Sequence, residues 1–353
     1  MPKPHLLNDI DRLLNDWLAQ RKLPAFRARQ IRRWLFAGRA ANFAAMSDLP
    51  QALRDDLAEA FTLWSANVSK CTEAEDGTEK LLLTLAGGGQ IECVLLRDRV
   101  RRTLCISTQV GCGMGCVFCA SGLDGVDRNL TTGEILEQVL LLQQRLADDE
   151  RLSHIVVMGM GEPLANLDAL MPALDELATP RDIANSGLGI SHRRITISTV
   201  GLPKAIRRLA DLDTRYRLAI SLHAPNDELR NQIVPINEKM SLEEILDSAD
   251  YYFDRSGRRL TFEYVLLAEL NDQPEHAHQL VRLLAGRTAL VNVIPYNPVA
   301  GLPYATPPAA AQQTFRQILE AGGLAVRFRH RKGDKINAAC GQLRRSQTKV
   351  EIQ

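Results

Sequence analysis

The chain has 353 residues, of which 45% are hydrophobic and 24% are charged, and its formal net charge is +1. This length allows two domains or one barrel with an appendage, and the composition is ordinary for a soluble globular protein. No run of about 18 apolar residues offers a membrane span, and the opening MPKPHLLNDIDRLLNDWLAQ mixes acidic residues into its apolar runs, which excludes a signal peptide; the expected compartment is the cytoplasm.

Helical periodicity covers the first part of the chain. Apolar residues recur at intervals of three and four in LLNDIDRLLNDWL and FRARQIRRWLF, and Pro50 lies near the start of a third helix in DLPQALRDDLAEAF. The composition then changes, and Gly87, Gly88 and Gly89 separate two apolar runs in EKLLLTLAGGGQIECVLL, which is a hairpin signal. We therefore predict a helical N-terminal domain over residues 1–65 and a small β-hairpin linker over residues 66–100.

From residue 101 onward, short apolar runs alternate with amphipathic segments, the first of which begins with a capping box of Thr131 and Glu134. About six β-then-α units predict an α/β fold over residues 101–353, with a parallel sheet curled into a full or partial barrel. Such barrels carry functional residues just after their strands, and polar motifs do follow the predicted strands here. The strands are TLCIST, HIVVMG, RITIST, YRLAIS, LTFEYVLL, ALVNVIP and LAVRFRH, and the motifs after five of them are QVGCGMGCVFC, GMGEP, STVG, SLHAPN and YNPVAG.

Three cysteines, Cys112, Cys116 and Cys119, form a C-x3-C-x2-C motif with interleaved glycines that let the backbone wrap around a bulky group. A reducing compartment disfavours disulfides, and seven cysteines are an odd number for a disulfide framework, so metal binding or chemistry is favoured. A structural zinc site or an electron-transfer cluster would need a fourth protein ligand, and the chain shows no second pair with metal spacing. Three thiolates on a [4Fe–4S] cluster leave one iron open for substrate chemistry, so we favour the cluster over zinc.

The cysteine segment also resembles the signature of radical S-adenosylmethionine enzymes, with Phe118 in the usual aromatic position. This resemblance implies a partial (βα)6 TIM-like barrel in which S-adenosylmethionine binds the open iron and yields a 5′-deoxyadenosyl radical on reduction. It also implies that Gly161 and Glu162 of GMGEP bind the amino group of S-adenosylmethionine. Without the resemblance, GMGEP is a turn with an ordinary surface carboxylate.

Motifs along nearly the whole chain are similar to the RlmN/Cfr family of RNA adenine methyltransferases. The resemblance implies methylation of an adenine carbon, with two molecules of S-adenosylmethionine used per turnover. Cys340 matches the cysteine that is first methylated and whose methyl group then gives a hydrogen atom to the adenosyl radical and adds to the adenine. Cys105 matches the thiol that attacks the protein–RNA crosslink and releases the product as a disulfide forms. The motifs are QVGCGMGCVFCASG, RNLT, MGMGEPL, SLHAPND, IVPIN, IPYNP, GLPY and AACGQL, with FRARQIRRWLF and MSDLP in the N-terminal part.

Other site residues follow from the same resemblance. Glu92 in IECVLL matches the carboxylate assigned as the proton acceptor, and the remaining cofactor contacts match Ser198, Ser221, Leu222, His223 and Asn297.

The residues alone allow plainer interpretations of these positions. Cys105 would be a buried, inert strand cysteine and Cys340 an incidental loop thiol. Glu92 would be a solvent-facing strand residue, and His223 a histidine with its hydrogen bonds satisfied inside the barrel. Cys71 and Cys93 match no motif and are expected to be structural, which gives the chain two further thiols without a role.

Basic residues gather in three places, although the net charge neither demands nor excludes nucleic acid. Because folded RNA is gripped through phosphate and shape, we predict that the first and third clusters hold RNA while the target adenine is flipped into the barrel mouth. The resemblance implies 23S rRNA, and for many members also tRNA, as the substrate, an external one-electron reductant such as flavodoxin or ferredoxin, and a monomer. The clusters are Arg27, Arg29, Arg32 and Arg33; Arg97, Arg99, Arg101 and Arg102; and Arg327, Arg329, Arg331, Lys332 and Lys335.

Three alternatives stay open. A C8-specific, Cfr-type enzyme would share these motifs, although C2 is favoured. A radical activase or maturase of a protein or peptide would need neither Cys340 nor Cys105, and an RNA-binding protein with a structural iron–sulfur site would not need the cofactor motifs. The chain also departs from the family in SGLDGVDRNLT, where Asp124 to Asp127 replace a Gln-Gly-aromatic step, and this bears on the RNA target more than on the radical chemistry.

Overall fold

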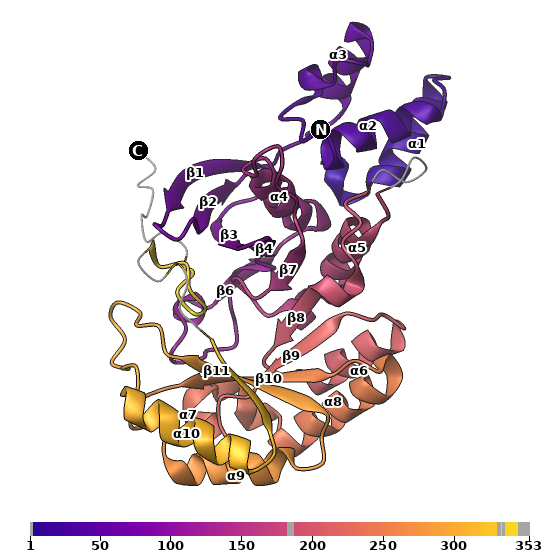
Figure 1. Ribbon diagram of the computed structural model, residues 1–353. Coiled ribbons are helices and arrows are strands. Elements are labelled where there is room, and N and C mark those ends of the chain that lie inside the picture. Colours follow the sequence, from indigo (N-terminus) through magenta and orange to yellow (C-terminus); the bar gives the residue numbers. More distant parts are fainter. Residues whose placement is uncertain (1–2, 182–186, 330–332, 334–335, 345–353) are drawn as a thin grey trace.

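The computed structural model describes residues 3–181, 187–329, 333 and 336–344 (Figure 1). Three helices open the chain, as predicted, and Pro50 is the residue directly before the third of them. They pack through their apolar stripes, for example where Trp17 meets Phe61 with ring centroids 5.8 Å apart. The helices are α1 (Ile10–Gln20), α2 (Phe26–Phe36) and α3 (Gln51–Ala60).

The body of the molecule is one sheet in which ten strands of the described chain are paired in the order β1-β2-β3-β4-β7-β8-β9-β10-β11-β12. Strands β1 to β4 pair with one another in antiparallel register. Strand β4 and strands β7 to β12 run parallel to one another. The strands are β1 (Ala66–Glu73), β2 (Glu79–Leu85), β3 (Gln90–Asp98), β4 (Arg101–Cys105), β7 (His154–Val157), β8 (Ile195–Thr199), β9 (Arg217–Ser221), β10 (Leu260–Leu266), β11 (Ala289–Pro295) and β12 (Ala325–Phe328).

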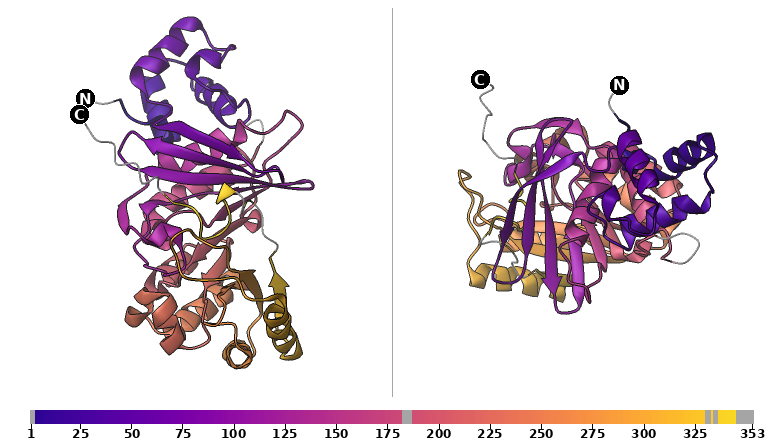
Figure 2. Two further views of the ribbon diagram at one scale, coloured as in Figure 1. Left: turned by 90° about the vertical axis from the view of Figure 1, so that its left-hand side faces the viewer. Right: turned by 90° about the horizontal axis from the view of Figure 1, so that it is seen from above.

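The predicted hairpin and the seven predicted parallel strands are therefore confirmed. The strands of the predicted linker, residues 66–100, join the barrel sheet, because β3 pairs with β4. Figure 2 shows from two further sides that the three N-terminal helices lie at one end of the molecule and the last barrel helices at the other. The domain boundaries at residues 65 and 100 stay a prediction.

Helices follow the parallel strands and cover the outer face of the curled sheet (Figure 1). The predicted capping box is present at the first of them, since the Thr131 side chain and the Glu134 side chain each accept the other's backbone N–H. In the part of the chain that the structure describes, no helix combines the length and apolarity needed to cross a membrane. The barrel helices are α4 (Thr132–Gln143), α5 (Leu167–Ala178), α6 (Pro203–Asp211), α7 (Asp227–Ile233), α8 (Leu242–Ser256), α9 (Pro274–Leu284) and α10 (Ala309–Ala321).

The cysteine motif lies in the loop between the two strands of a second sheet, which the sequence did not predict. This sheet pairs β5 (Gln109–Gly111) with β6 (Val126–Asn129) in antiparallel register. Strands this short show too few alternating residues to be recognised from periodicity. The acidic segment that departs from the family pattern therefore leads into β6, which closes the cysteine loop.

Candidate active site

A cavity of about 140 Å³ opens at the carboxyl ends of the parallel strands, where the sequence predicted the functional residues. Three of the predicted site residues, Cys105, Leu222 and Glu92, do not line it. The predicted site residues that do line it are Cys112, Cys116, Cys119, Gly161, Glu162, Ser198, Ser221, His223, Asn297 and Cys340.

Backbone hydrogen bonds to residues nearby in sequence fix the conformation of the cysteine loop. The Cys112 N–H donates to Gly125 O at 2.8 Å, and the Cys119 N–H donates to Cys116 O at 3.1 Å. Gly111 has φ +79°, and a Cβ at this position would lie 2.1 Å from Gly125 O, so only glycine fits between β5 and β6. The β5–β6 sheet thus presents the three thiols to the cavity.

The three thiols suit a cluster better than a single ion. Burial raises the pKa of each thiol, to about 12 for Cys112, and the neighbouring sulfurs Cys119 and Cys112 raise the pKa of Cys116 further. Within the described residues, no group of three or more His, Cys, Asp or Glu side chains converges tightly enough to hold a metal ion. Each thiolate on an iron–sulfur cluster binds a different iron, so the thiols need not converge on one point.

Glu162 offers a buried carboxylate to the same cavity, with only 2% of its surface exposed. Its two oxygens accept the backbone N–H groups of Leu164 at 3.0 Å and Val200 at 2.9 Å. Burial raises the pKa of Glu162, and these hydrogen bonds act in the opposite direction. A carboxylate fixed in this way suits a cationic amino group of a ligand, and the alternative of an ordinary surface carboxylate is wrong.

His223 is neutral at physiological pH, because burial and then the charge of Arg230 lower its pKa to about 3. Its Nδ1 accepts the Val265 N–H at 3.1 Å, which leaves the proton on Nε2. The ring stands edge-on to Phe118 of the cysteine motif, with centroids 4.9 Å apart. This histidine both satisfies its own hydrogen bond, as the plainer interpretation expects, and lines the cavity.

Asn297 links the cofactor side of the cavity to the Cys340 loop. Its Nδ2 donates to Cys340 O at 3.2 Å, whereas its buried Oδ1 has no hydrogen-bond partner in the described structure. A buried acceptor without a donor is costly unless a ligand supplies one. Asn297 and the three thiols are therefore consistent with a bound cluster and a cofactor that carries hydrogen-bond donors.

Cys340 reaches the cavity from the far end of the chain and lies near Cys105. Cys340 is exposed to the open cavity, and the protein around it still raises the pKa of its thiol through desolvation. Burial and the charge of Cys340 raise the pKa of Cys105 to about 12, which makes Cys105 a neutral thiol at pH 7. All seven cysteines are free, so the disulfide that the resemblance implies is absent here.

Comparison with known proteins identifies this arrangement. The family model described as "Radical SAM superfamily" matches residues 106–281, and the model described as "Ribosomal RNA large subunit methyltransferase N-terminal domain" matches residues 5–63. A protein of Rhodopirellula baltica named "probable dual-specificity RNA methyltransferase RlmN" is 62% identical, over 99% of this chain and 93% of that protein. The chain belongs to the RlmN family.

Two further proteins agree with this assignment. A protein of Symbiobacterium thermophilum with the same name is 45% identical, over 93% of this chain and 88% of its own length. A crystal structure of a radical SAM methyltransferase from Sphaerobacter thermophilus superposes with a TM-score of 0.92 at 41% identity, over 97% of this chain and 99% of that one. RlmN family membership confirms the predicted fold class, the enzyme class of a radical S-adenosylmethionine RNA methyltransferase, and the predicted cluster and cofactor.

Glu92, the proton acceptor implied by the RlmN resemblance, is not at the cavity. It is buried, so its interpretation as a solvent-facing strand residue is wrong. Its Oε1 lies 2.7 Å from Lys80 Nζ, and its Oε2 accepts the Arg344 N–H at 2.9 Å. Lys80 Nζ also donates to Asn337 O at 3.0 Å, so Glu92 and Lys80 clamp the Cys340 loop onto the sheet.

Arg230 was missed because a single arginine on a short amphipathic helix looks like a surface residue. It is fully buried in α7 and donates to the backbone oxygens of Val200, Ser221 and Leu222, which follow or end β8 and β9. Burial lowers its pKa to about 10, so it stays charged at pH 7, and its charge lowers the pKa of Cys116. Arg230 thus fixes the strand ends of the cofactor side and places a cation behind the cluster loop.

Glu263 was also missed, although the sequence carried a signal. It is the only charged residue of LTFEYVLL, and a carboxylate inside an apolar strand is unusual unless it has a role. It lines the cavity with 5% of its surface exposed, and Asn292 Nδ2 donates to it at 3.0 Å. Burial raises the pKa of Glu263, and the charge of Arg329 opposes this.

The N-terminal arginines divide into structural and exposed residues. Arg32 is buried and joins the N-terminal helices to the barrel, since it pairs with Asp11 at 2.9 Å and also with Glu176 of α5. Arg29 and Arg33 are exposed. Arg27 is half-buried and donates to Gln30 at 2.7 Å, so in this cluster it is Arg32 that could meet a phosphate only by breaking a buried ion pair.

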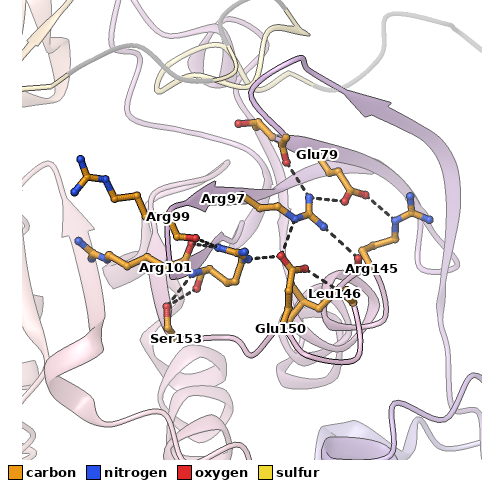
Figure 3. Close-up of polar contacts among 12 residues, drawn as sticks. Glu79, Arg97, Arg99, Arg101, Arg145, Leu146, Glu150 and Ser153 are labelled. Carbon is orange, nitrogen blue, oxygen red and sulfur yellow. Dashed lines mark hydrogen bonds and ion pairs between the residues drawn. The ribbon is translucent and has the colours of Figure 1, made fainter.

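The other two basic clusters also divide. Arg97 pairs with Glu79 at 2.6 Å and with Glu150 at 3.4 Å, whereas Arg99 and Arg101 point their guanidinium groups away from this network (Figure 3). In the third cluster, Arg327 is exposed and Arg329 turns to Cys340. The other predicted members, Arg331, Lys332 and Lys335, lie outside the described residues.

Proposed function

We propose that this chain methylates C2 of an adenine in 23S rRNA and in tRNA, with Cys340 as the carrier of the methyl group. The observation that carries the proposal is the convergence of Cys340 and the three cluster cysteines on one cavity. The relatives named above as dual-specificity RNA methyltransferases support a choice of two RNA substrates. An activase of proteins or peptides has no use for a thiol at position 340.

The residues divide the work between holding the cofactor and handling the methyl group. When bound, the cluster and S-adenosylmethionine supply a methyl group for transfer and a carbon radical that abstracts hydrogen. Glu162 holds the amino group, and Asn297 uses its unpartnered Oδ1 to accept a cofactor donor. The metal ligands are Cys112, Cys116 and Cys119, and the remaining cofactor contacts are Gly161, Ser198, Ser221 and His223, which line the cavity, whereas Leu222 does not line it.

Cys340 and Cys105 handle the substrate side. Cys340 presents its sulfur to the cavity, accepts the methyl group and then carries the adenine as a thioether crosslink. Cys105 gives up its proton and attacks the Cys340 sulfur, so that a sulfur–sulfur bond forms and the bond from the Cys340 sulfur to the methylene carbon breaks. The electron pair of the broken bond stays with the methylene group on the base, which takes up a proton and leaves as the methylated adenine. Because the pKa of Cys105 is about 12, it rests as a thiol and does not compete with Cys340 for the first methyl group.

Glu92 acts as the proton acceptor only after its contacts with Lys80 and Arg344 break, because these two residues bind both of its carboxylate oxygens. The adenine enters the cavity flipped out of its stack, and exposed basic side chains such as Arg29 and Arg327 contact phosphates on either side. An external one-electron reductant of the flavodoxin or ferredoxin type completes the reaction, and the enzyme acts as a monomer.

The test is anaerobic reconstitution with iron, sulfide, S-adenosylmethionine and reductant, followed by incubation with ribosomal RNA or tRNA. We expect 5′-deoxyadenosine in the supernatant and 2-methyladenosine in the digested RNA, measured by mass spectrometry. The C8 isomer in its place would assign the chain to the Cfr-type alternative. 5′-Deoxyadenosine without any methylated nucleoside would contradict the proposal and favour an activase.

A further inference from the structure

Arg329 contacts the sulfur of Cys340, which is proposed above to carry the methyl group. It follows β12 directly, and its N–H donates to Val293 O at 2.9 Å, which extends the pairing of β12 with β11 by one residue. Its Nη1 then donates to Cys340 Sγ at 3.8 Å, a length within reach of a hydrogen bond to sulfur. The side chain is only partly exposed, in contrast to exposed Arg327 two residues earlier.

The other ionisable groups around this sulfur come from three different elements. Among these groups, the Glu263 carboxylate of β10 is the one that raises the pKa of the Cys340 thiol, through its negative charge. A charge on Cys340 in turn raises the pKa values of Cys105, at the end of β4, and of Cys119 in the cluster loop. Arg329 opposes Glu263, since its charge lowers the pKa of the Cys340 thiol while burial and Glu263 raise it.

This arrangement matters because a thiolate, not a thiol, is the nucleophile in methyl transfer. A sulfur beside the Glu263 carboxylate would remain protonated without a nearby cation. The backbone of Arg329 is fixed by its pairing to β11, and the charge of Glu263 interacts with the guanidinium.

We propose that Arg329 is a positioning residue that holds the Cys340 sulfur at the cavity wall and stabilises its thiolate for methylation. The proposal rests on the function proposed above for Cys340. In the step, the thiol proton leaves to water and the thiolate forms a carbon–sulfur bond to the transferred methyl group. The methyl–sulfonium bond breaks, and its electron pair stays on the departing sulfur, which becomes neutral.

The test measures the reactivity of Cys340 directly, without RNA and without turnover. The full chain is treated with iodoacetamide at pH 7.5, and the alkylation rate of unmethylated Cys340 is followed by peptide mass spectrometry. Exposed Cys71 is the internal reference. The variants are Arg329→Gln, Arg329→Lys as the conservative rescue, and Arg327→Gln as the matched control on the same segment.

We expect Cys340 to react about 10-fold more slowly in Arg329→Gln, because a cation within ~4 Å shifts a neighbouring acid by a pKa unit or more. Arg329→Lys keeps the charge and should recover most of the rate, and Arg327→Gln and the Cys71 rate should not change. An unchanged Cys340 rate in Arg329→Gln, or a lysine variant as slow as the glutamine variant, overturns the assignment. If slow alkylation is found but wild-type enzyme makes no methyladenine, the Arg329 assignment stands and the proposed function fails.

Discussion

Two loops bring cysteines to the cavity, and they are held in different ways. The cluster loop, residues 111–125, is fixed by its own short sheet and by a glycine that no other residue can replace. The Cys340 loop, residues 336–344, has no sheet of its own. It is pinned by residues far away in sequence, through Lys80 to Asn337 O, Ser121 Oγ to Leu343 O at 2.7 Å, and Asn297 to Cys340 O.

The difference matches the two tasks. Ligands of a cluster must keep a constant geometry through every turnover, and a locally closed loop provides it. A methyl carrier must meet first one partner and then another, and a loop held by a few separable contacts allows such movement. The clamp of Glu92 and Lys80 is the contact that must open if Glu92 is to reach the substrate.

The largest effect should follow from removing a cluster ligand. Cys119→Ser is expected to lower bound iron and the visible absorbance of the reconstituted protein to background, because the remaining two thiolates cannot hold a cluster. Cys71→Ser is the control, since Cys71 lies on the outer strand β1 away from the cavity. Full iron content in Cys119→Ser would contradict the ligand assignment.

The second effect tests whether the cluster loop is closed by local geometry. Gly111→Ala places a methyl group 2.1 Å from Gly125 O in left-handed backbone and should lower the free energy of unfolding by about 3 kcal/mol or more. Gly88→Ala has a similar φ of +88° but open space around it, and should cost only about 1 kcal/mol. Denaturant unfolding measures both, and equal losses would show that the close contact with Gly125 is unimportant.

The third effect concerns the clamp on the other loop. Lys80→Met removes the cation that joins Glu92 to Asn337 O and leaves a buried carboxylate with one partner, at a cost of about 2 kcal/mol. Hydrogen exchange should rise over residues 336–344 while iron content stays constant. Slow exchange in this loop after the substitution would mean that the contacts of Ser121 and Asn297 suffice without the clamp.

The smallest expected effect is a pH dependence of the free energy of unfolding, which arises from the buried His223. Because the pKa of His223 is lowered to about 3 in the folded chain, the fold holds it neutral, and stability is lost as pH falls below the unfolded value near 6.5. Between pH 7 and pH 5.5 this histidine should account for about 1 kcal/mol of lost stability. His223→Asn can still accept the Val265 N–H and should abolish that part of the loss, whereas exposed His278→Asn should not.

Thermal melts at several pH values measure this effect. A wild-type curve that is flat down to pH 5.5, or one that His223→Asn leaves unchanged, would contradict the assignment of a buried neutral histidine.

The comparison of the cluster loop with the Cys340 loop also explains which parts of the site the sequence could predict. The cluster cysteines, Glu162 and the strands that present them depend on short-range signals, namely C-x3-C-x2-C, a motif after a strand and apolar runs of strand length. Those predictions were confirmed for the fold and for the position at the cavity. Their roles in binding and catalysis stay predictions.

The contacts that the sequence could not predict join distant segments. Nothing near Arg329 in the sequence indicates that it faces Cys340 and Glu263, because the three meet only when β12 pairs with β11 and β11 pairs with β10. The same holds for Arg230, whose hydrogen bonds go to the ends of two other strands, and for Glu92, which the strand pattern alone did not reveal as buried. Charge patterns showed where cations are, but not which of them are already paired.

The most direct measurement is the fate of a labelled methyl group. The enzyme is charged with methyl-labelled S-adenosylmethionine, freed of excess label, and then supplied with RNA and unlabelled cofactor, and mass spectrometry follows both the Cys340 peptide and the adenine nucleosides. We expect the label to appear first on Cys340 and then to pass to the adenine carbon. Methylated adenine that carries no label, together with a label that stays on Cys340, would contradict the account.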